Sequence, residues 1–192
     1  MKKKVMLIAL LALSFQIFCD PYDYSVDSQD YEPIKNLVEN EFQKWINDPI
    51  IINAIKDANR LNKTRTEDEI LVQDNKWRAG DAEFQGLYTN TPSSMFLKQK
   101  QKESDNLYSE LFIMDFQGCN VGLSDLTSDF WQGDEAKFKK SFNNGAGSVF
   151  IDEIELDEST GTYQVQVSLP IVDKTNNEVV GAITIGIDMS KL

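Results

Sequence analysis

The sequence predicts an α+β fold, in which helices come first and cover a central antiparallel sheet. Two observations predict this class. In the first half, apolar residues recur at three- and four-residue steps, which is the period of an amphipathic helix. In the second half, short alternating segments are separated by turn residues, which is typical of strands joined by hairpins. Helices followed by consecutive strands indicate an α+β architecture.

A long N-terminal helix is predicted to begin at Pro33, because proline suits the first turn of a helix. Its apolar face contains Ile34, Leu37, Val38, Phe42, Trp45 and Ile46. Asp48-Pro49 interrupts or restarts this helix, since proline removes a backbone donor and clashes with the preceding turn. The apolar stripe then continues to Leu61. Trp45, and Trp77 in the next helix, are expected to be core residues.

A further helix is predicted from Thr66 to Gly80. Thr66 and Glu69 have the spacing of a capping box, and glycine is the usual residue just beyond a helix end. Residues 81–106 are expected to be long and irregular, with three lysines at positions 98, 100 and 102. These lysines form a solvated basic face or close over an anionic ligand.

Five strands are predicted in the second half, at residues 107–114, 121–124, 149–156, 162–172 and 178–189. A helix over residues 129–142 separates the second strand from the third. In the fourth strand, Tyr163, Val165, Val167 and Leu169 alternate with Gln164, Gln166 and Ser168. This alternation predicts one buried face and one face in contact with water.

The N-terminus has the features of a secretory signal peptide. Three lysines at positions 2–4 precede an uncharged apolar run from Val5 to Phe18, which is shorter than the roughly 20 residues of a spanning helix. The sequence therefore predicts a signal peptide over residues 1–19, an extended leader over 20–32 and one domain over 33–192. An uncleaved membrane anchor is the alternative. A lipoprotein anchored through Cys19 is disfavoured, because Phe18 and Gln16 are not small. The mature protein is expected to be periplasmic or secreted.

The charge of the chain is strongly negative. The whole sequence has 19 basic and 31 acidic residues, a net charge of −12. Removal of residues 1–19 takes away three lysines and no acids, which leaves 16 against 31, a net charge of −15. Such a surface repels phosphate backbones and anionic lipid headgroups, so nucleic acid is not expected as a partner.

Several catalytic and metal-binding chemistries are missing from the sequence. It has no histidine, which excludes the usual serine and cysteine triads and most zinc sites. It has no glycine-rich phosphate loop. Cys119 would be the one cysteine of the mature chain, so no internal disulfide is expected. The acids between Asp152 and Glu158 fit the solvated side of a strand. We expect no enzyme activity, no metal and no cofactor.

Two segments resemble the Cache family of extracellular sensor domains, which are related to PAS domains. The first is residues 111–118 followed by 128–138, and the second is residues 150–189, which includes 157–161, 169–171 and 181–188. The resemblance implies a single PAS-like domain, with a long helix against the sheet and a ligand pocket between the sheet and overlying loops. It implies binding of a small metabolite, such as an amine, amino acid or carboxylate. Such domains are usually the outer part of membrane receptors, but no second membrane segment follows here, so we expect a free-standing sensor that reports to a separate membrane receptor.

The resemblance also implies a set of ligand-binding residues, which are Trp131, Phe138, Asp157, Tyr163 and Asp188. Members that recognise amino acids carry an arginine, a tryptophan and a tyrosine where this chain has Glu135, Lys137 and Phe138. With the arginine absent and acidic positions kept, an amine is favoured over an acid. Core packing is the alternative for the two aromatic residues Trp131 and Tyr163, and Asp157 fits a turn residue equally well.

Two other functions stay open at this point. One is an exported protein–protein interaction module without a small ligand, which predicts a filled space between sheet and loops and an exposed apolar patch. The other, less favoured, is a secreted hydrolase that uses two carboxylates.

Overall fold

The structure is a computed structural model that describes residues 22–24, 31–157 and 162–192. The predicted signal peptide lies outside the described residues, and so does most of the predicted leader. Within the described residues, no helix is long and apolar enough to cross a membrane.

The first half of the chain is helical. Its α-helices are α1 (Glu32–Asn36), α2 (Pro49–Leu61), α3 (Glu67–Arg78), α4 (Ala82–Thr89) and α5 (Pro92–Glu103), and α1 continues through a π turn (Leu37–Glu41) and a 3-10 turn (Phe42–Lys44). The predicted restart at Asp48-Pro49 is confirmed, because the Asp48 side chain accepts a hydrogen bond from the Ile50 amide at 2.9 Å and caps α2. The capping box that begins α3 is also confirmed.

The second half contains the sheet. Its strands are β2 (Tyr108–Met114), β3 (Asn120–Leu123), β4 (Val149–Asp157), β5 (Thr162–Asp173) and β6 (Glu178–Asp188), with α6 (Ala136–Phe142) between β3 and β4. The strand order is β1-β4-β5-β6-β2-β3. All neighbours pair antiparallel except β1 (Tyr22–Tyr24), which pairs parallel with the edge strand β4. The α+β class and the antiparallel sheet of five strands are confirmed, and β1 adds a short sixth strand.

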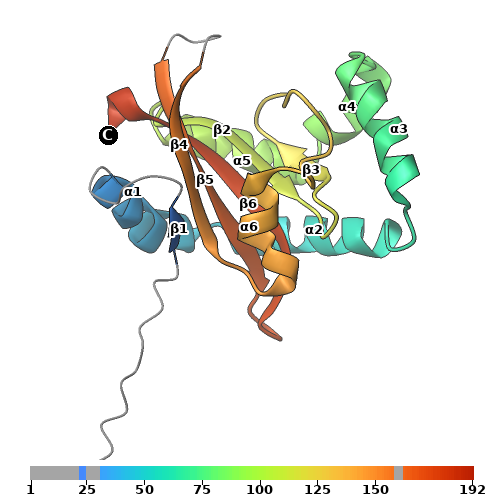
Figure 1. Ribbon diagram of the computed structural model, residues 1–192, viewed down its shortest axis with the longest axis horizontal. Helices are drawn as coiled ribbons and strands as arrows, with labels where there is room; N and C mark the ends of the chain where they lie inside the picture. The colour runs from blue at the N-terminus through green and yellow to red at the C-terminus, as the bar shows by residue number, and fades with distance from the viewer. Residues whose placement is uncertain (1–21, 25–30, 158–161) are drawn as a thin grey trace, which may run out of the picture.

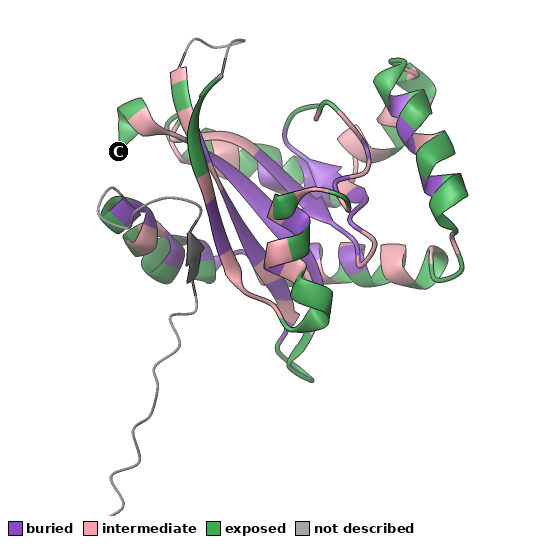
Figure 2. Ribbon diagram, viewed as in Figure 1, coloured by how far each residue is buried: buried purple, intermediate pink, exposed green. Residues whose placement is uncertain are grey.

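The sheet is covered on both faces, as Figures 1 and 2 show. On one face, α1, α2 and α5 bury a continuous apolar cluster that includes Phe42, Ile51, Ile55 and Leu97. It receives every second residue of β5, from Val165 to Ile171. On the other face lie α6 and the loop that leads into it.

A smaller core fills part of this second face. It contains Trp77 from α3, Phe112 from β2, Phe130 from the loop and Phe138 from α6. Trp45 and Trp77 are buried in the two cores, as the helical spacing predicted. The rest of the second face is not filled by apolar side chains, and the candidate site lies there.

The expectation of an irregular segment over residues 81–106 is wrong, because α4 and α5 occupy it. Both helices begin at a capping side chain. Asp81 accepts a hydrogen bond from the Phe84 amide, and Thr91 accepts one from the Ser94 amide, each at 3.1 Å. Pro92 follows at the first helical position. These cap signals are local, and the apolar periodicity of both helices is weak.

The predicted helix over residues 129–142 is too long at its start, because α6 begins at Ala136. The amides of Phe130 and Trp131 instead donate to the Asp74 carboxylate on α3, at 2.8 and 3.0 Å. A tertiary contact therefore holds these residues in a loop, and sequence periodicity does not report such a contact.

Candidate ligand-binding cleft

A cleft of about 1040 Å³ opens on the face of the sheet opposite α1 and α2. Strands β2, β5 and β6 form its floor, α5 forms one side, and the loop between β3 and α6 covers part of it. The lining residues are Lys98, Gln101, Lys102, Asn106, Tyr108, Ser109, Glu110, Phe112, Asp125, Leu126, Thr127, Ser128, Gln132, Lys137, Thr162, Gln164, Gln166 and Asp188. This volume is at the upper end of the range of small-molecule sites.

The floor of the cleft is made of hydrogen-bonding side chains. Gln166 on β5 donates to Glu110 on β2 at 2.7 Å, and Ser109 donates to Gln164 at 2.8 Å. Ser109 and Glu110 both line the cleft although they are consecutive in a strand, because the strand register shifts between positions 108 and 110. Gly186 on the intervening strand makes room for them, since a Cβ there would lie 2.4 Å from the Ser109 Oγ.

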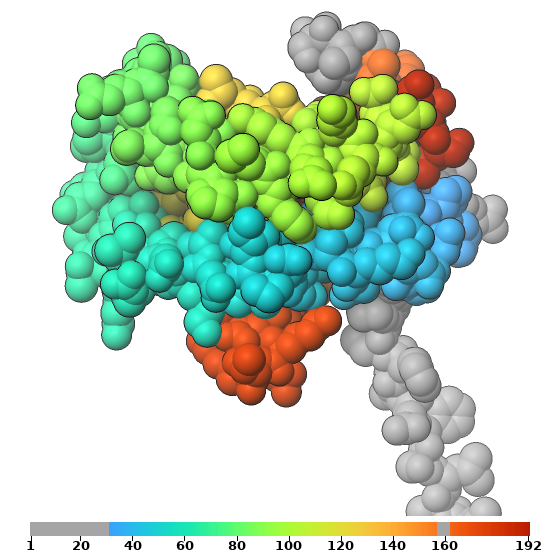
Figure 3. Space-filling view, turned by 180° about the vertical axis from the view of Figure 1, so that it is seen from behind, coloured from blue at the N-terminus to red at the C-terminus, as the bar shows by residue number. Residues whose placement is uncertain are grey.

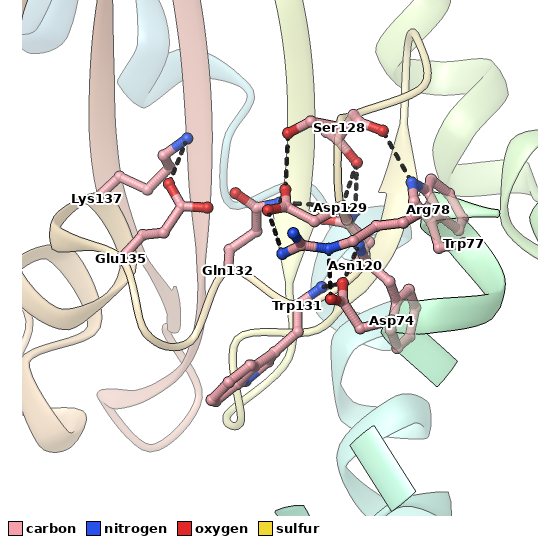
Figure 4. A network of polar contacts seen from close by, with 12 residues as sticks. Asp74, Trp77, Arg78, Asn120, Ser128, Asp129, Trp131, Gln132, Glu135 and Lys137 are labelled. Atoms are coloured by element: carbon pink, nitrogen blue, oxygen red, sulfur yellow. Dashed lines mark hydrogen bonds and ion pairs between the residues drawn. The ribbon is translucent and has the colours of Figure 1, made fainter. Parts of the chain in front are cut away.

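The loop over the cleft, residues 124–135, is attached to α3 by a polar network (Figure 4). Asp74 accepts the two loop amides described above and also pairs with Arg78 at 2.7 Å. Arg78 reaches on to Asp129 at 3.0 Å. Asp129 in turn accepts a hydrogen bond at 2.7 Å from Gln132, which lines the cleft. A continuous chain of contacts thus joins α3 to the wall of the cleft.

Two further contacts fix the same loop. The indole of Trp77 on α3 donates to the Thr127 carbonyl at 2.8 Å. Asn120 on β3 donates to the Thr127 hydroxyl at 2.7 Å and to the Asp129 carbonyl at 3.1 Å. Because the donors Trp77 and Asn120 are buried, they hold the loop at a defined height above the floor of the cleft. The cleft between the loop and the floor is therefore preorganised.

Among the described lining residues of the cleft, positive and negative charges are equal in number. Its lining includes three lysines (98, 102 and 137) and three acids (110, 125 and 188). Lys137 is the most buried of these cations, with a side chain 15% exposed and 3.0 Å from the Glu135 carboxylate. Its ammonium lies 5.6 Å from the centre of the Phe112 ring. A cleft with both signs of charge suits a small polar molecule that carries at least one charged group.

Among the predicted site residues whose side chains the structure describes, Asp188 lines the cleft. The hydroxyl and amide of Ser190 donate to its Oδ1 at 2.7 and 2.9 Å. These two hydrogen bonds lower the pKa of Asp188, the hydroxyl having the larger effect. Asp188 thus supplies a negative charge, held in place by Ser190, at the end of β6.

The other predicted site residues lie elsewhere. Trp131 is half-buried, and its indole donates to the Gln117 carbonyl at 2.9 Å. Phe138 is buried and stacks on Phe142, with ring centres 5.2 Å apart. Tyr163 is exposed on the strand face opposite Gln164. Asp157 ends β4, and its side chain lies outside the described residues. Trp131, Phe138 and Tyr163 do not belong to the described cleft lining, and a ligand contact by any of the five residues stays a prediction.

The sequence did not single out the glutamines of the cleft. Gln164 and Gln166 were identified as the wet face of an alternating strand, whereas in the structure they form the floor of a partly covered cleft. A signal was present, because two glutamines at alternate positions next to apolar partners mark a polar stripe on a central strand. What was missing is that the residue 124–135 loop lies above that stripe.

Within the described part of the chain, no group of three or more histidine, cysteine, aspartate and glutamate side chains is placed to hold a metal ion. The free Cys119 is fully buried, and burial raises the pKa of its thiol.

Comparisons with known proteins give matches among solved structures. No family model matches the chain, and no curated protein matches it. The solved structures include the sensor domain of the histidine kinase DctB from V. cholerae, with 15% identity over 84% of this chain and 58% of that one, at a TM-score of 0.39. They also include the ligand-binding domain of the Campylobacter jejuni chemoreceptor Tlp3 in complex with L-valine, with 15% identity over 80% and 62%, at a TM-score of 0.39.

A third match is the ligand-binding domain of the Pseudomonas aeruginosa PAO1 amino acid chemoreceptor PctC in complex with GABA, with 13% identity over 71% of this chain and 61% of that one, at a TM-score of 0.40. These proteins are sensor domains, the class of protein that the sequence resembles. The chain spans about 60% of the length of these three domains. At such identities and scores, no ligand or partner of theirs transfers to this chain.

Proposed function

We propose that this protein is an extracytoplasmic sensor module that binds a small polar metabolite in the cleft over β2, β5 and β6. The observation that supports this function is the cleft itself. The same sheet face is filled by aromatic side chains next to α6, yet over Gln164 and Gln166 it is open. A domain that needed only stability would fill this space with apolar residues, because each buried methylene contributes about 0.8 kcal/mol.

The charges of the cleft favour a ligand that carries an ammonium group, which is an amine or an amino acid rather than a simple carboxylate. Asp188 accepts two hydrogen bonds from Ser190, which lower its pKa, and Glu110 lies on the floor nearby on β2. Two carboxylates attract an ammonium group, since a buried charge needs a partner. Lys137, the most buried cation of the cleft, would pair with the carboxylate of an amino acid.

The setting in the cell belongs to the same proposal. The N-terminal signal predicts export, so the module would bind its ligand in the periplasm or outside the cell and report to a separate membrane receptor. We expect no catalysis in the cleft, because the sequence has no histidine that could activate a hydroxyl group of the lining as a nucleophile.

A thermal-denaturation screen tests this function. Amines, amino acids and carboxylates are added singly to the purified domain. A ligand at 100 times its Kd stabilises the folded state by about 2.7 kcal/mol, which raises the Tm of a domain of this size by about 5–10 °C. The expected result is a shift of that size with one compound class that carries an ammonium group. A screen in which no compound shifts the Tm would contradict the proposal.

Two matched pairs of variants locate the binding. Lys137→Met and Asp188→Asn remove charges from the cleft, and we expect each to weaken binding of a zwitterionic hit at least about tenfold, the loss of one charged hydrogen bond. Lys139→Met on the same helix and Glu178→Gln at the other end of the same strand lie outside the cleft lining and should leave binding unchanged. Equal effects within a pair would place the ligand elsewhere.

A further inference from the structure

The register of β2, β5 and β6 arranges the floor of the cleft in three rows that run across the strands. Residues in one row are paired with their neighbours on the next strand. The rows, in order along the sheet, are Gln164–Asp188, then Gln166–Gly186–Glu110, then Ser168–Thr184–Phe112. Successive rows lie two residues apart on β6, so all three belong to the same face of the sheet.

Each row brings one charge to the cleft. The first row contributes the carboxylate of Asp188, and the second contributes that of Glu110. At the third row the ammonium of Lys137 on α6 lies 5.6 Å from the centre of the Phe112 ring. All three charged residues line the cleft. The order of charge along the floor is therefore negative, negative, positive.

The other charged residues of the lining stand at the α5 side of the cleft. They are Lys98 and Lys102 on α5 and Asp125 on the loop. Lys98 donates to the Thr89 carbonyl at 2.8 Å, and Asp125 accepts a hydrogen bond from Gln101 at 2.6 Å. These charges belong to the wall of the cleft, and they do not change the order along its floor.

The two ends of the floor keep the capacity to bind a charged group. The donors to Asp188 are the amide and hydroxyl of Ser190, which carry no charge. Lys137 pairs with Glu135 at 3.0 Å (Figure 4). Because an ammonium group has three N–H donors, Lys137 can keep this contact and also donate to the carboxylate of a ligand.

The spacing of the rows sets the length of a ligand that contacts both ends. A strand rises about 3.3–3.4 Å per residue, so the first and third rows, four residues apart, are separated by about 13 Å. A charged hydrogen bond of about 2.8 Å at each end leaves about 7–8 Å between the end groups of the ligand.

Lysine has end groups at this separation. Six bonds join its carboxylate carbon to its side-chain nitrogen, and since three extended bonds span about 3.8 Å, six span about 7.5 Å. Its α-ammonium group, next to the carboxylate, would face Glu110 in the second row. An amino acid with an apolar side chain has both charges on one carbon and does not reach Asp188.

The field of the whole chain favours the same ligand. The net charge of −12 attracts a molecule with a net positive charge, which lysine has and an amino acid with an apolar side chain lacks. Figure 3 shows the opposite side of the molecule, where α1 and α2, in blue to cyan, and α5, in yellow-green, cover the sheet. The charged rows are therefore approached from the cleft side.

We propose that the cleft recognises an α-amino acid whose long side chain ends in a positive charge, as in lysine, with its carboxylate at Lys137 and its side-chain ammonium at Asp188. This inference rests on the function proposed above and narrows its class of ligand. The specificity-determining contact is the one at Asp188, because only the side-chain charge of the ligand reaches the first row.

Two probes that differ in one charged group test the proposal. L-Norleucine has the same four side-chain carbons as L-lysine and lacks the terminal ammonium group. Isothermal titration calorimetry of the whole domain measures both, and we expect lysine to bind at least about tenfold more tightly, the effect of one charged hydrogen bond. L-Ornithine and L-2,4-diaminobutyrate, which shorten the stem by one and two carbons, should bind progressively more weakly than lysine.

Variants of the cleft assign this preference to a residue. In Asp188→Asn, which keeps an oxygen that accepts from Ser190, the affinities for lysine and norleucine should become equal within about twofold. Glu178→Gln, at the other end of the same strand and outside the cleft lining, should keep the preference of the wild type. Lys137→Met should weaken binding of both amino acids, because both carry the carboxylate.

The outcomes separate this inference from the function on which it rests. Equal affinities of the wild type for lysine and norleucine would overturn the inference alone, and so would a preference for lysine that persists in Asp188→Asn. Failure of lysine to bind, while another compound with an ammonium group shifts the Tm, would also overturn only the inference. A screen in which no compound shifts the Tm would contradict both.

Discussion

Asp74 holds the loop over the cleft, and substitutions there test the account of that network. Asp74 is buried and accepts the amides of Phe130 and Trp131, and it pairs with Arg78, whose side chain is 55% exposed. In Asp74→Ala both amides lose their acceptor. At about 1–3 kcal/mol for each buried group without a partner, the expected loss in the free energy of unfolding is about 3 kcal/mol.

Asp74→Asn is the matched variant, because an amide oxygen still accepts from both backbone groups. It loses the ion pair with Arg78, whose guanidinium side is open to solvent, and solvent screening limits such a pair to about 1 kcal/mol. We therefore expect Asp74→Asn and Arg78→Ala each to cost about 1 kcal/mol or less, clearly below Asp74→Ala. Urea unfolding followed by tryptophan fluorescence measures all three, with Arg60→Ala, which breaks an exposed pair with Asp57, as the control.

Two results would refute this reasoning. One is an Asp74→Ala variant within about 1 kcal/mol of the wild type, which would mean that the loop amides find other partners. The other is an Asp74→Asn variant as unstable as Asp74→Ala, which would mean that the charge, and not the acceptor geometry, holds the loop.

Three further predictions concern stability and reactivity. The ammonium of Lys56, 2.6 Å away, lowers the pKa of Asp173 to about 2. This contact therefore stabilises the fold above about pH 4, and its contribution is lost as the pH falls toward 2. The Tm difference between wild type and Asp173→Asn should be present at pH 6 and vanish at pH 2, and a difference that is constant with pH would contradict this prediction. Cys119 should not react with a thiol reagent at pH 8 until the protein is unfolded, since burial raises its pKa, and stoichiometric labelling of the native protein would show the site to be open. Gly118→Ala and Gly80→Ala both place a side chain at positive φ, at a cost of about 1–2 kcal/mol; only Gly118→Ala adds a clash, 2.4 Å from the Gly133 Cα, and it should unfold at least about 1 kcal/mol more easily.

The fold was predictable where local patterns carry it. The alternation of Val165, Val167 and Leu169 placed β5 correctly, and the caps at Asp48 and Thr66 placed two helix starts. The start of α6 was not predictable, because the preceding residues bond to Asp74, more than 50 positions earlier in the chain. Tertiary contacts of that kind override periodicity.

The candidate site was less predictable than the fold. Asp188 was predicted from the resemblance to Cache domains, and it lines the cleft. Gln164 and Gln166 were assigned to solvent, because a sequence does not show that a distant loop covers one face of a strand. Trp131 and Phe138 pack away from the cleft, which is what aromatic side chains beside a core usually do.

Side-chain amide resonances give the most direct test of the central claim, which is that a small polar ligand occupies the cleft. A hit from the thermal screen is titrated into ¹⁵N-labelled protein. If the ligand occupies the cleft, the side-chain amide signals of Gln164, Gln166 and Gln132 shift together, while that of Gln85 on α4, outside the cleft, stays in place. Shifts at Gln85 without shifts at Gln164 and Gln166 would contradict it.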